Sequence, residues 1–150
     1  IVDCTRGVPV LLRPGAITRD DIERACGLRP LSKEELTADT PRASGTLLAH
    51  YAPNAKVRLM DARQLQSALD ILGRDGRNIA IYHRSPLHVT TAQLLLRRMS
   101  DEPRDVAREL FGMLRNFDDW GAKLIWIETP PDTADWEGVR DRLQRAAAAG

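Results

Sequence analysis

The stretch Asn78-Ile79-Ala80-Ile81-Tyr82 decides the fold class of this chain of 150 residues. Its apolar residues follow one another almost without a break, which is typical of a β-strand that is covered on both faces. Leu124-Ile125-Trp126-Ile127 has the same character and ends at Pro130-Pro131, and Lys56–Met60 predicts a further strand. Leu94-Leu95-Leu96 is a further candidate, the third in chain order, although periodicity alone does not exclude a helix for so short a run.

Apolar residues at helical spacing separate these strands. One helix is predicted before Gly73, a second after Pro103 and a third near the end of the chain. Their apolar faces would consist of Leu65, Ala68, Leu69 and Leu72, of Val106, Leu110, Met113, Leu114 and Phe117, and of Trp136, Val139, Leu143 and Ala146. Strands that alternate with helices predict a three-layer, Rossmann-like α/β domain with a largely parallel sheet over residues 55–150.

The first part of the chain has a different pattern. Ile1–Thr5 and Val8–Arg13 predict a β-hairpin with its turn at Arg6-Gly7. Thr18 and Asp21 have the spacing of a capping box at the start of a short helix. A unit this small does not bury a core alone, so we expect it to pack against other protein surface.

The composition indicates a globular protein without a strong charge. The net charge of +1 gives no indication of a nucleic-acid or anionic-membrane partner. No apolar run approaches the ~20 residues of a membrane span, and we expect a cytoplasmic protein. Cys4 and Cys26 form no Cys-x-x-Cys motif and favour reduced thiols over a disulfide or metal pair. His83 and His88 lack the spacing and the third ligand of a zinc site, so no metal site is predicted.

A connector of unusual composition, Ser44-Gly45-Thr46-Leu47-Leu48-Ala49-His50-Tyr51-Ala52-Pro53, joins the two halves. Its glycine and its proline disfavour helix and central strand, so we expect a linker over residues 31–54. The ring side chains of His50 and Tyr51 have three interpretations: they anchor the linker, line a ligand pocket or transfer protons. No partner acid, base or nucleophile lies nearby in the sequence, and no catalytic residue is assigned.

Three motifs in this order resemble the Sua5/YrdC/YwlC family, the threonylcarbamoyl-AMP synthases. They are Ile1-Val2-Asp3, the strand end Leu12-Arg13-Pro14-Gly15-Ala16-Ile17 and the connector's His50-Tyr51-Ala52-Pro53. The resemblance implies a C-terminal fragment with three parts. Residues 1–30 would be a hairpin-helix remnant of the YrdC-like catalytic domain, 31–54 the linker, and 55–150 the Sua5 C-terminal domain.

The resemblance also implies a reaction and its participants. The family joins L-threonine, bicarbonate and ATP to give threonylcarbamoyl-AMP and pyrophosphate, for the threonylcarbamoyladenosine modification of tRNA. Mg²⁺ would accompany the ATP, and other proteins of tRNA threonylcarbamoylation are possible partners. The family's main basic cluster and threonine-binding residues belong to the domain upstream of Ile1, so this chain alone is expected to be inactive.

The resemblance finally implies roles for single residues. Arg13 and Tyr51 would contact ATP or the adenylate, and Ser44, Gly45, His50 and Pro53 would belong to a lid formed by the linker. Without this resemblance, the position of Arg13 at the end of a strand favours a side chain that is exposed to solvent.

A second class of function stays open from the sequence. The α/β domain could be a non-catalytic interaction or regulatory module that docks a partner of the tRNA-modifying machinery. The chain contains no Gly-x-x-x-x-Gly-Lys-Ser/Thr motif and no Gly-x-Gly-x-x-Gly after the first strand of the α/β domain. A Rossmann-like architecture does not by itself imply nucleotide binding.

Overall fold

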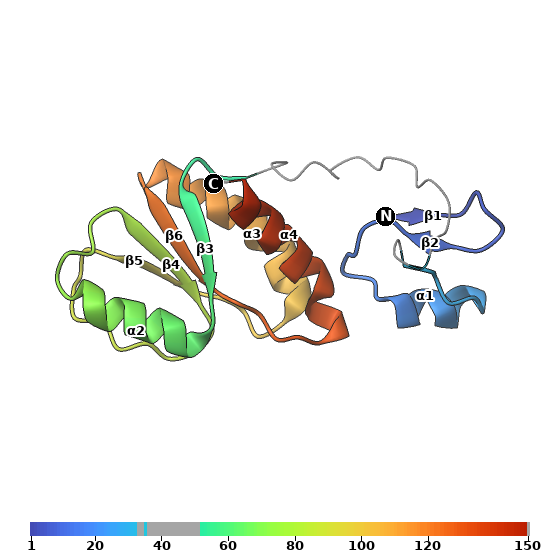
Figure 1. Cartoon of the computed structure of the whole chain (residues 1–150), viewed down its shortest axis with the longest axis horizontal. Helices are drawn as coiled ribbons and strands as arrows, with labels where there is room; N and C mark the ends of the chain where they lie inside the picture. The colour runs from blue at the N-terminus through green and yellow to red at the C-terminus, as the bar shows by residue number, and fades with distance from the viewer. Residues whose placement is uncertain (33–34, 36–51, 150) are drawn as a thin grey trace.

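The structure, a computed structural model, describes residues 1–32, 35 and 52–149. It confirms the predicted α/β class, with a parallel sheet that has helices on both faces (Figure 1). A hairpin and a short helix from the start of the chain lie beside the last helix of the sheet region. The boundaries predicted for the three parts of the chain stay a prediction.

The sheet has four strands, all of them parallel. They are β3 (Lys56–Met60), β4 (Ile79–His83), β5 (Leu95–Arg98) and β6 (Leu124–Glu128). Their spatial order is β3-β6-β4-β5. The last strand of the chain, β6, therefore lies between β3 and β4 and pairs with both. The leucine run that left strand and helix open therefore forms a strand, and it pairs with β4 at the edge of the sheet.

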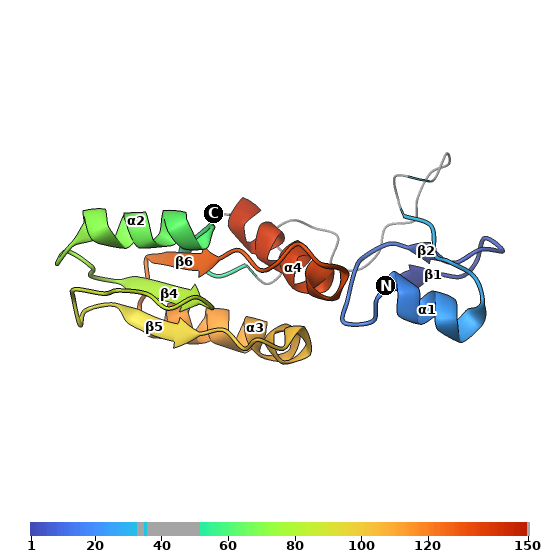
Figure 2. The ribbon, with the colours of Figure 1, turned by 90° about the horizontal axis from the view of Figure 1, so that it is seen from below.

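Three helices cover the sheet and make it three layers (Figure 2). They are α2 (Ala62–Leu72) on one face, and α3 (Pro103–Asp119) and α4 (Glu137–Ala148) on the other. A short 3₁₀ turn, η1 (Ala134–Trp136), leads into α4. Each helix falls where the apolar spacing predicts one.

The apolar run of β4 is explained by this double coverage. Ala80 and Tyr82 pack toward α3 and α4, whereas Ile79 and Ile81 pack toward α2. Because successive strand residues point to opposite faces, a strand between two helical layers needs apolar residues at every position. Burial raises the pKa of the Tyr82 phenol, whose hydroxyl donates a hydrogen bond of 2.6 Å to Glu109.

The start of the chain forms a small unit of its own. Strands β1 (Val2–Asp3) and β2 (Val10–Leu11) pair antiparallel, and helix α1 (Arg19–Cys26) follows. This confirms the hairpin and the helix predicted there, with strands of only two residues each. No residue of α1 is buried, so its apolar stripe lies outside the core.

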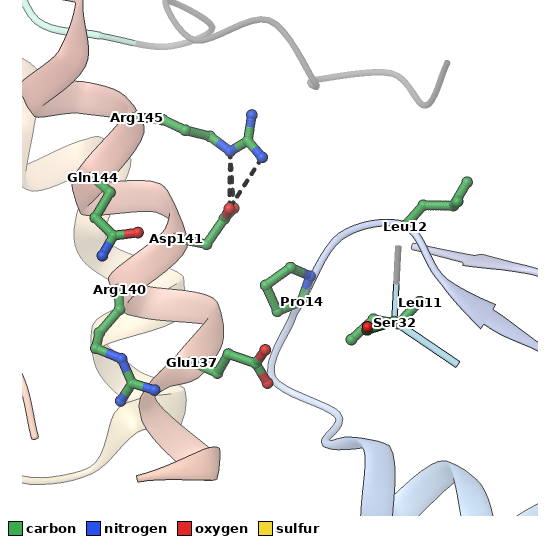
Figure 3. A pocket seen from close by; sticks show the side chains of 9 residues that line it. All are labelled: Leu11, Leu12, Pro14, Ser32, Glu137, Arg140, Asp141, Gln144 and Arg145. Atoms are coloured by element: carbon green, nitrogen blue, oxygen red, sulfur yellow. Dashed lines mark hydrogen bonds and ion pairs between the residues drawn. The ribbon is translucent and has the colours of Figure 1, made fainter. Parts of the chain in front are cut away.

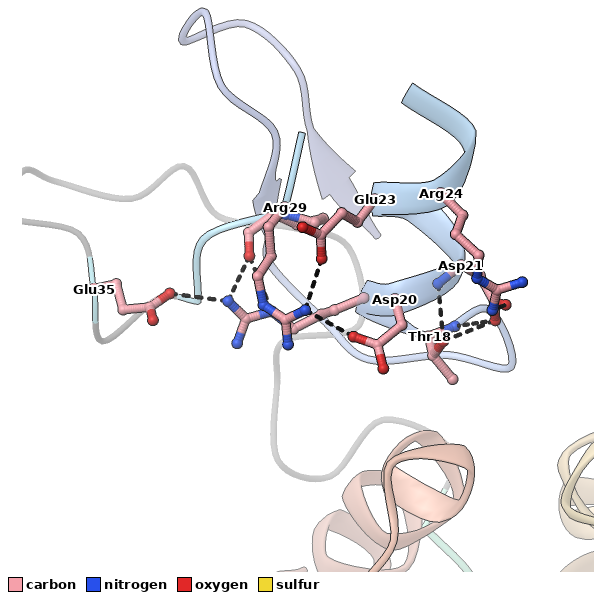
Figure 4. A network of polar contacts seen from close by, with 9 residues as sticks. Thr18, Asp20, Asp21, Glu23, Arg24, Arg29 and Glu35 are labelled. Carbon is pink, nitrogen blue, oxygen red and sulfur yellow. Dashed lines mark hydrogen bonds and ion pairs between the residues drawn. The ribbon is translucent and has the colours of Figure 1, made fainter. Parts of the chain in front are cut away.

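Polar contacts at both ends define α1 (Figure 4). The predicted capping box is present: the Thr18 hydroxyl accepts from the Asp21 amide, and the Asp21 carboxylate accepts from Thr18. Arg29 then donates to Asp20 at 2.7 Å and to Glu23 at 2.8 Å. Local hydrogen bonds of this kind stabilise a helix whose side chains contribute little buried area.

Candidate functional site

A groove of about 350 Å³ lies between the end of β2 and helix α4 (Figure 3). The residues that line it are Leu11, Leu12, Pro14 and Ser32 on one wall and Glu137, Arg140, Asp141, Gln144 and Arg145 on the other. Figure 3 shows polar side chains of α4 beside the loop that follows β2. The groove thus joins two segments from opposite ends of the chain.

Arg13 is held at this junction, between β2 and the Pro14-Gly15 turn. Its Nε atom donates to Oδ2 of Asp141 at 3.3 Å, and its side chain is 13% exposed. The position at a strand end alone predicts a solvent-exposed Arg13, and the structure shows instead a mostly buried side chain. No hydrogen-bond partner for the two Nη atoms of Arg13 is found in the described part of the chain, and neither atom is fully buried.

The carboxylate of Asp141 is itself fixed within α4. Arg145, one turn further along the helix, donates from Nε to both carboxylate oxygens and from Nη2 to Oδ1, at 3.0 to 3.1 Å. These hydrogen bonds raise the pKa of the Arg145 guanidinium. An aspartate oriented from one side can hold a second arginine in a defined direction.

A second cavity, of about 180 Å³, opens on the other side of Arg13. Ile1, Arg13, Pro14, Gly15, Phe111 and Arg142 line it. Nη1 of Arg142 donates to the carbonyl of Ala107 at 3.1 Å, and its guanidinium lies 5.8 Å from the centre of the Phe111 ring. Burial and the nearby charge of Arg13 lower the pKa of Arg142, so these two guanidinium groups repel each other.

A close backbone contact brings the loop and the helix together. A Cβ atom on Gly138 would lie 2.7 Å from the carbonyl carbon and oxygen of Gly15. Real Cβ atoms almost never approach backbone this closely, so only glycine fits at this position of α4. The contact places the turn after Arg13 directly against the helix that carries Asp141.

Only one of the predicted lid positions, Pro53, lies among the described residues. Pro53 lines a small cavity with Ala52, Phe111 and Asp118. Oδ2 and Oδ1 of Asp118 accept from the backbone amides of Asn54 and Ala55, at 2.8 and 3.0 Å, and so fix where the linker enters β3. The other lid positions, Ser44, Gly45 and His50, and the predicted adenylate contact Tyr51 lie outside the described residues.

Glu128 and His83, near the carboxyl ends of β6 and β4, have hydrogen-bond partners within the protein. Glu128 is buried, and its carboxylate accepts from the amides of Arg84 and Ser85 and from the Ser85 hydroxyl, at 2.6 to 2.8 Å. His83 ends β4 half-buried, with Nδ1 2.8 Å from the Ser85 carbonyl, whereas His88 is exposed. Glu128 therefore caps the loop after β4.

Three general properties concern the described residues only. Within the described ranges, no three histidine, cysteine, aspartate or glutamate side chains are grouped so that they could hold a metal ion. None of the described helices has both the length and the apolar character needed to cross a membrane. Cys4 and Cys26 are both exposed free thiols.

Sequence reasoning missed the α4 side of the junction. The Asp141–Arg145 spacing is visible as a helical ion pair, but the contact of Asp141 with Arg13 spans 128 positions. Neither Arg142 nor Gly138 carries a motif of its own, and the reason for each lies in a segment distant in sequence. A single sequence holds no signal that pairs these positions.

Comparison with known proteins covers nearly the whole chain. The family described as "Threonylcarbamoyl-AMP synthase, C-terminal domain" matches residues 17–148. Two proteins named threonylcarbamoyl-AMP synthase, from Bacillus subtilis and Pyrococcus abyssi, are 30% and 26% identical over 98% of this chain. The chain spans 44% of the length of each, which is less than half.

Solved structures give the same fold. A crystal structure of Pyrococcus abyssi Sua5 complexed with L-threonine matches 99% of this chain and 45% of that protein, with a TM-score of 0.74 and 24% identity. A variant of that protein with alanine in place of a consecutive histidine and tyrosine matches equally well, with a TM-score of 0.74 and 23% identity. The match to residues 17–148 shows that the chain belongs to the family of threonylcarbamoyl-AMP synthase C-terminal domains.

Proposed function

We propose that this chain acts as the C-terminal part of a threonylcarbamoyl-AMP synthase. The enzyme would join L-threonine, bicarbonate and ATP into threonylcarbamoyl-AMP and release pyrophosphate and water, for the modification of tRNA. The observation that carries the proposal is the family match over residues 17–148, together with relatives that bear this name. L-threonine as a substrate is supported by the solved relative that is described as complexed with it.

Arg13 is the residue proposed to contact the phosphate groups of ATP or of the adenylate. A guanidinium suits this role because its planar donors match the oxygens of a phosphate. Asp141 holds Arg13 through Nε alone, and no other described residue binds its two Nη atoms, which suits them to a ligand. Mg²⁺ would arrive with the nucleotide as part of the substrate, and no residue of this chain is assigned to it.

The linker is proposed to close over the nucleotide. Tyr51 would contact the adenylate, while Ser44, Gly45, His50 and Pro53 would shape the lid around it. A closed site protects a carbamate intermediate from water, which is a common function of such loops. A relative in which a consecutive histidine and tyrosine were both replaced offers a parallel for this pair.

The remaining catalytic groups are proposed to come from outside this chain, so the 150 residues alone would be inactive. The test measures threonylcarbamoyl-AMP formation from ATP, L-threonine and bicarbonate, by the full-length gene product and by this chain. We expect product from the gene product only. An active 150-residue chain would contradict the proposal that the remaining catalytic groups lie outside it.

Two variants of the gene product then test the lid. Deletion of residues 44–53 removes the whole connector, and Tyr51→Phe removes a single hydroxyl. We expect the deletion to lower turnover by about tenfold or more, since one lost charge-assisted or closing contact is worth about that factor. Unchanged turnover after the deletion would exclude the lid. If no ATP-dependent product forms at all, the chain is better explained as a non-catalytic docking module.

A further inference from the structure

Two arginines from opposite ends of the chain line one cavity, the space of about 180 Å³ between the Pro14-Gly15 turn and helices α3 and α4. Arg13 reaches it from the end of β2, and Arg142 reaches it from α4. The other lining residues are Ile1, Pro14, Gly15 and Phe111, none of which carries an acidic side chain. The cavity therefore has a strongly positive lining.

Both guanidinium groups are held from one side only. Arg13 donates through Nε to Asp141, and Arg142 donates through Nη1 to the carbonyl of Ala107. Within the described part of the chain, the Nη atoms of Arg13 and the Nε and Nη2 atoms of Arg142 have no hydrogen-bond partner. None of these four nitrogens is fully buried, so all of them remain open to a ligand.

Among the described residues, positive charge outnumbers negative charge around this cavity. Asp141 is the carboxylate in contact with Arg13, and Arg145 shares that same carboxylate through three hydrogen bonds. Within the described ranges, Asp141 is thus the one carboxylate that contacts this group of three arginines, Arg13, Arg142 and Arg145. Glu137 lies one turn earlier on α4 and lines the larger groove rather than this cavity. Two partly buried cations that repel each other are stabilised when an anion binds between them.

We propose that Arg142 and Arg13 together bind one phosphate-bearing anion in this cavity, with Asp141 as the residue that positions Arg13. Phosphate is the expected ligand class because guanidinium groups bind its oxygens with paired, charge-assisted hydrogen bonds. The anion site itself follows from the geometry of this chain. Its identification with a phosphate of ATP or with pyrophosphate rests on the proposed function.

The inference gives α4 a direct part in ligand binding. In the proposed synthase, the turn of α4 that carries Asp141 and Arg142 would supply half of a phosphate site, in addition to supporting the loop. The close contact of Gly138 with Gly15 keeps the two halves at a fixed separation. Two cations contributed by different segments also make binding sensitive to how those segments are docked.

The test titrates the 150-residue chain with inorganic pyrophosphate in a calorimeter at constant ionic strength. We expect Arg13→Gln and Arg142→Gln each to weaken binding by about tenfold, the factor for one charged hydrogen bond. Arg108→Gln, which removes an exposed charge from α3, is the matched control and should change affinity less than about twofold. Equal binding by the wild type and Arg142→Gln, or no binding by the wild type, overturns the proposal.

If Arg142→Gln fails to fold, an NMR titration of the unmodified chain tests the anion site instead. Pyrophosphate should shift the NMR signals of the amides at Arg13, Gly15 and Arg142, and leave that of Arg108 in place. Shifts confined to other residues overturn the site. The synthase activity of the full-length protein is a separate result. An inactive gene product whose C-terminal chain binds pyrophosphate through Arg142 contradicts the proposed function and supports the anion site.

Discussion

At the residue scale, the carboxylates of Asp118 and Glu128 fix two loop segments that lie outside the strand pairing of the sheet. Asp118 binds the amides of Asn54 and Ala55 at the entry to β3, and Glu128 binds the loop after β4. The sequence places both residues at the ends of predicted elements. It does not identify the amides that they bind, because those lie 43 to 64 positions away.

Glu128→Gln tests the strength of such a cap. One oxygen of Glu128 accepts from two amides and the other from the Ser85 hydroxyl. A glutamine side chain can keep its oxygen toward the two amides and donate to the Ser85 hydroxyl, so the substitution removes the negative charge and keeps the hydrogen-bond geometry. We expect the substitution to lower the free energy of unfolding by about 1 kcal/mol at pH 7, because charge-assisted hydrogen bonds to a carboxylate become weaker neutral ones. Urea unfolding measures it, with the exposed Asp101→Asn as control.

The same residue predicts a pH dependence. Burial raises the pKa of Glu128, but the hydrogen bonds from Ser85 and Arg84 outweigh it and lower the pKa below its ordinary value of 4.5. A lowered pKa in the folded state contributes stability above the unfolded-state pKa, and this contribution is lost as the pH falls through the folded-state pKa. The stability difference between wild type and Glu128→Gln should therefore shrink as the pH falls below the unfolded-state pKa and through the lowered folded-state pKa of Glu128. A difference that stays constant over this range contradicts the assignment.

At the element scale, the strands and helices follow from local pattern. The apolar run at β4 and the helical spacing of α3 predict their elements because burial on both faces, or on one stripe, demands those residues. The spatial order of the strands is different. Insertion of β6 between β3 and β4 depends on long-range packing, which no local pattern records.

Two glycines in helices give a matched pair of substitutions. A Cβ on Gly112 of α3 would meet no atom within 4 Å, whereas a Cβ on Gly138 of α4 would meet the backbone of Gly15 at 2.7 Å. Gly112→Ala should stabilise the chain by about 0.5–1 kcal/mol through helix propensity. Gly138→Ala should bring no such gain and should loosen the loop after Arg13.

Urea unfolding compares the two variants directly, and the signal of the Gly15 amide in NMR spectra reports on the loop. If Gly138→Ala stabilises the chain as much as Gly112→Ala, the turn at Gly15 does not pack against α4. That result would also weaken the anion site, because Arg13 follows the position of this turn.

At the scale of the whole molecule, the hairpin unit and the sheet region meet at α4. The sequence predicts both parts, and the His-Tyr and Arg-Pro-Gly motifs indicate the family, but the surface that joins them is absent from every local pattern. Asp141, Gly138 and Arg142 acquire their roles only when residues 13–15 lie against them. The chain also covers 44% of its named relatives, so the site it forms is proposed as one part of a larger one.

We propose that Arg13, held against α4, contacts the nucleotide of a threonylcarbamoyl-AMP synthase. The most direct measurement is kcat/KM for ATP of the full-length gene product and of its Arg13→Gln variant, after urea unfolding has shown that both fold. Arg29→Gln, an exposed arginine that pairs only with Asp20 and Glu23 among the described residues, is the control. We predict that Arg13→Gln lowers kcat/KM by about tenfold or more while Arg29→Gln changes it less than about twofold. Equal values of kcat/KM for wild type and Arg13→Gln would contradict a contact between Arg13 and the nucleotide.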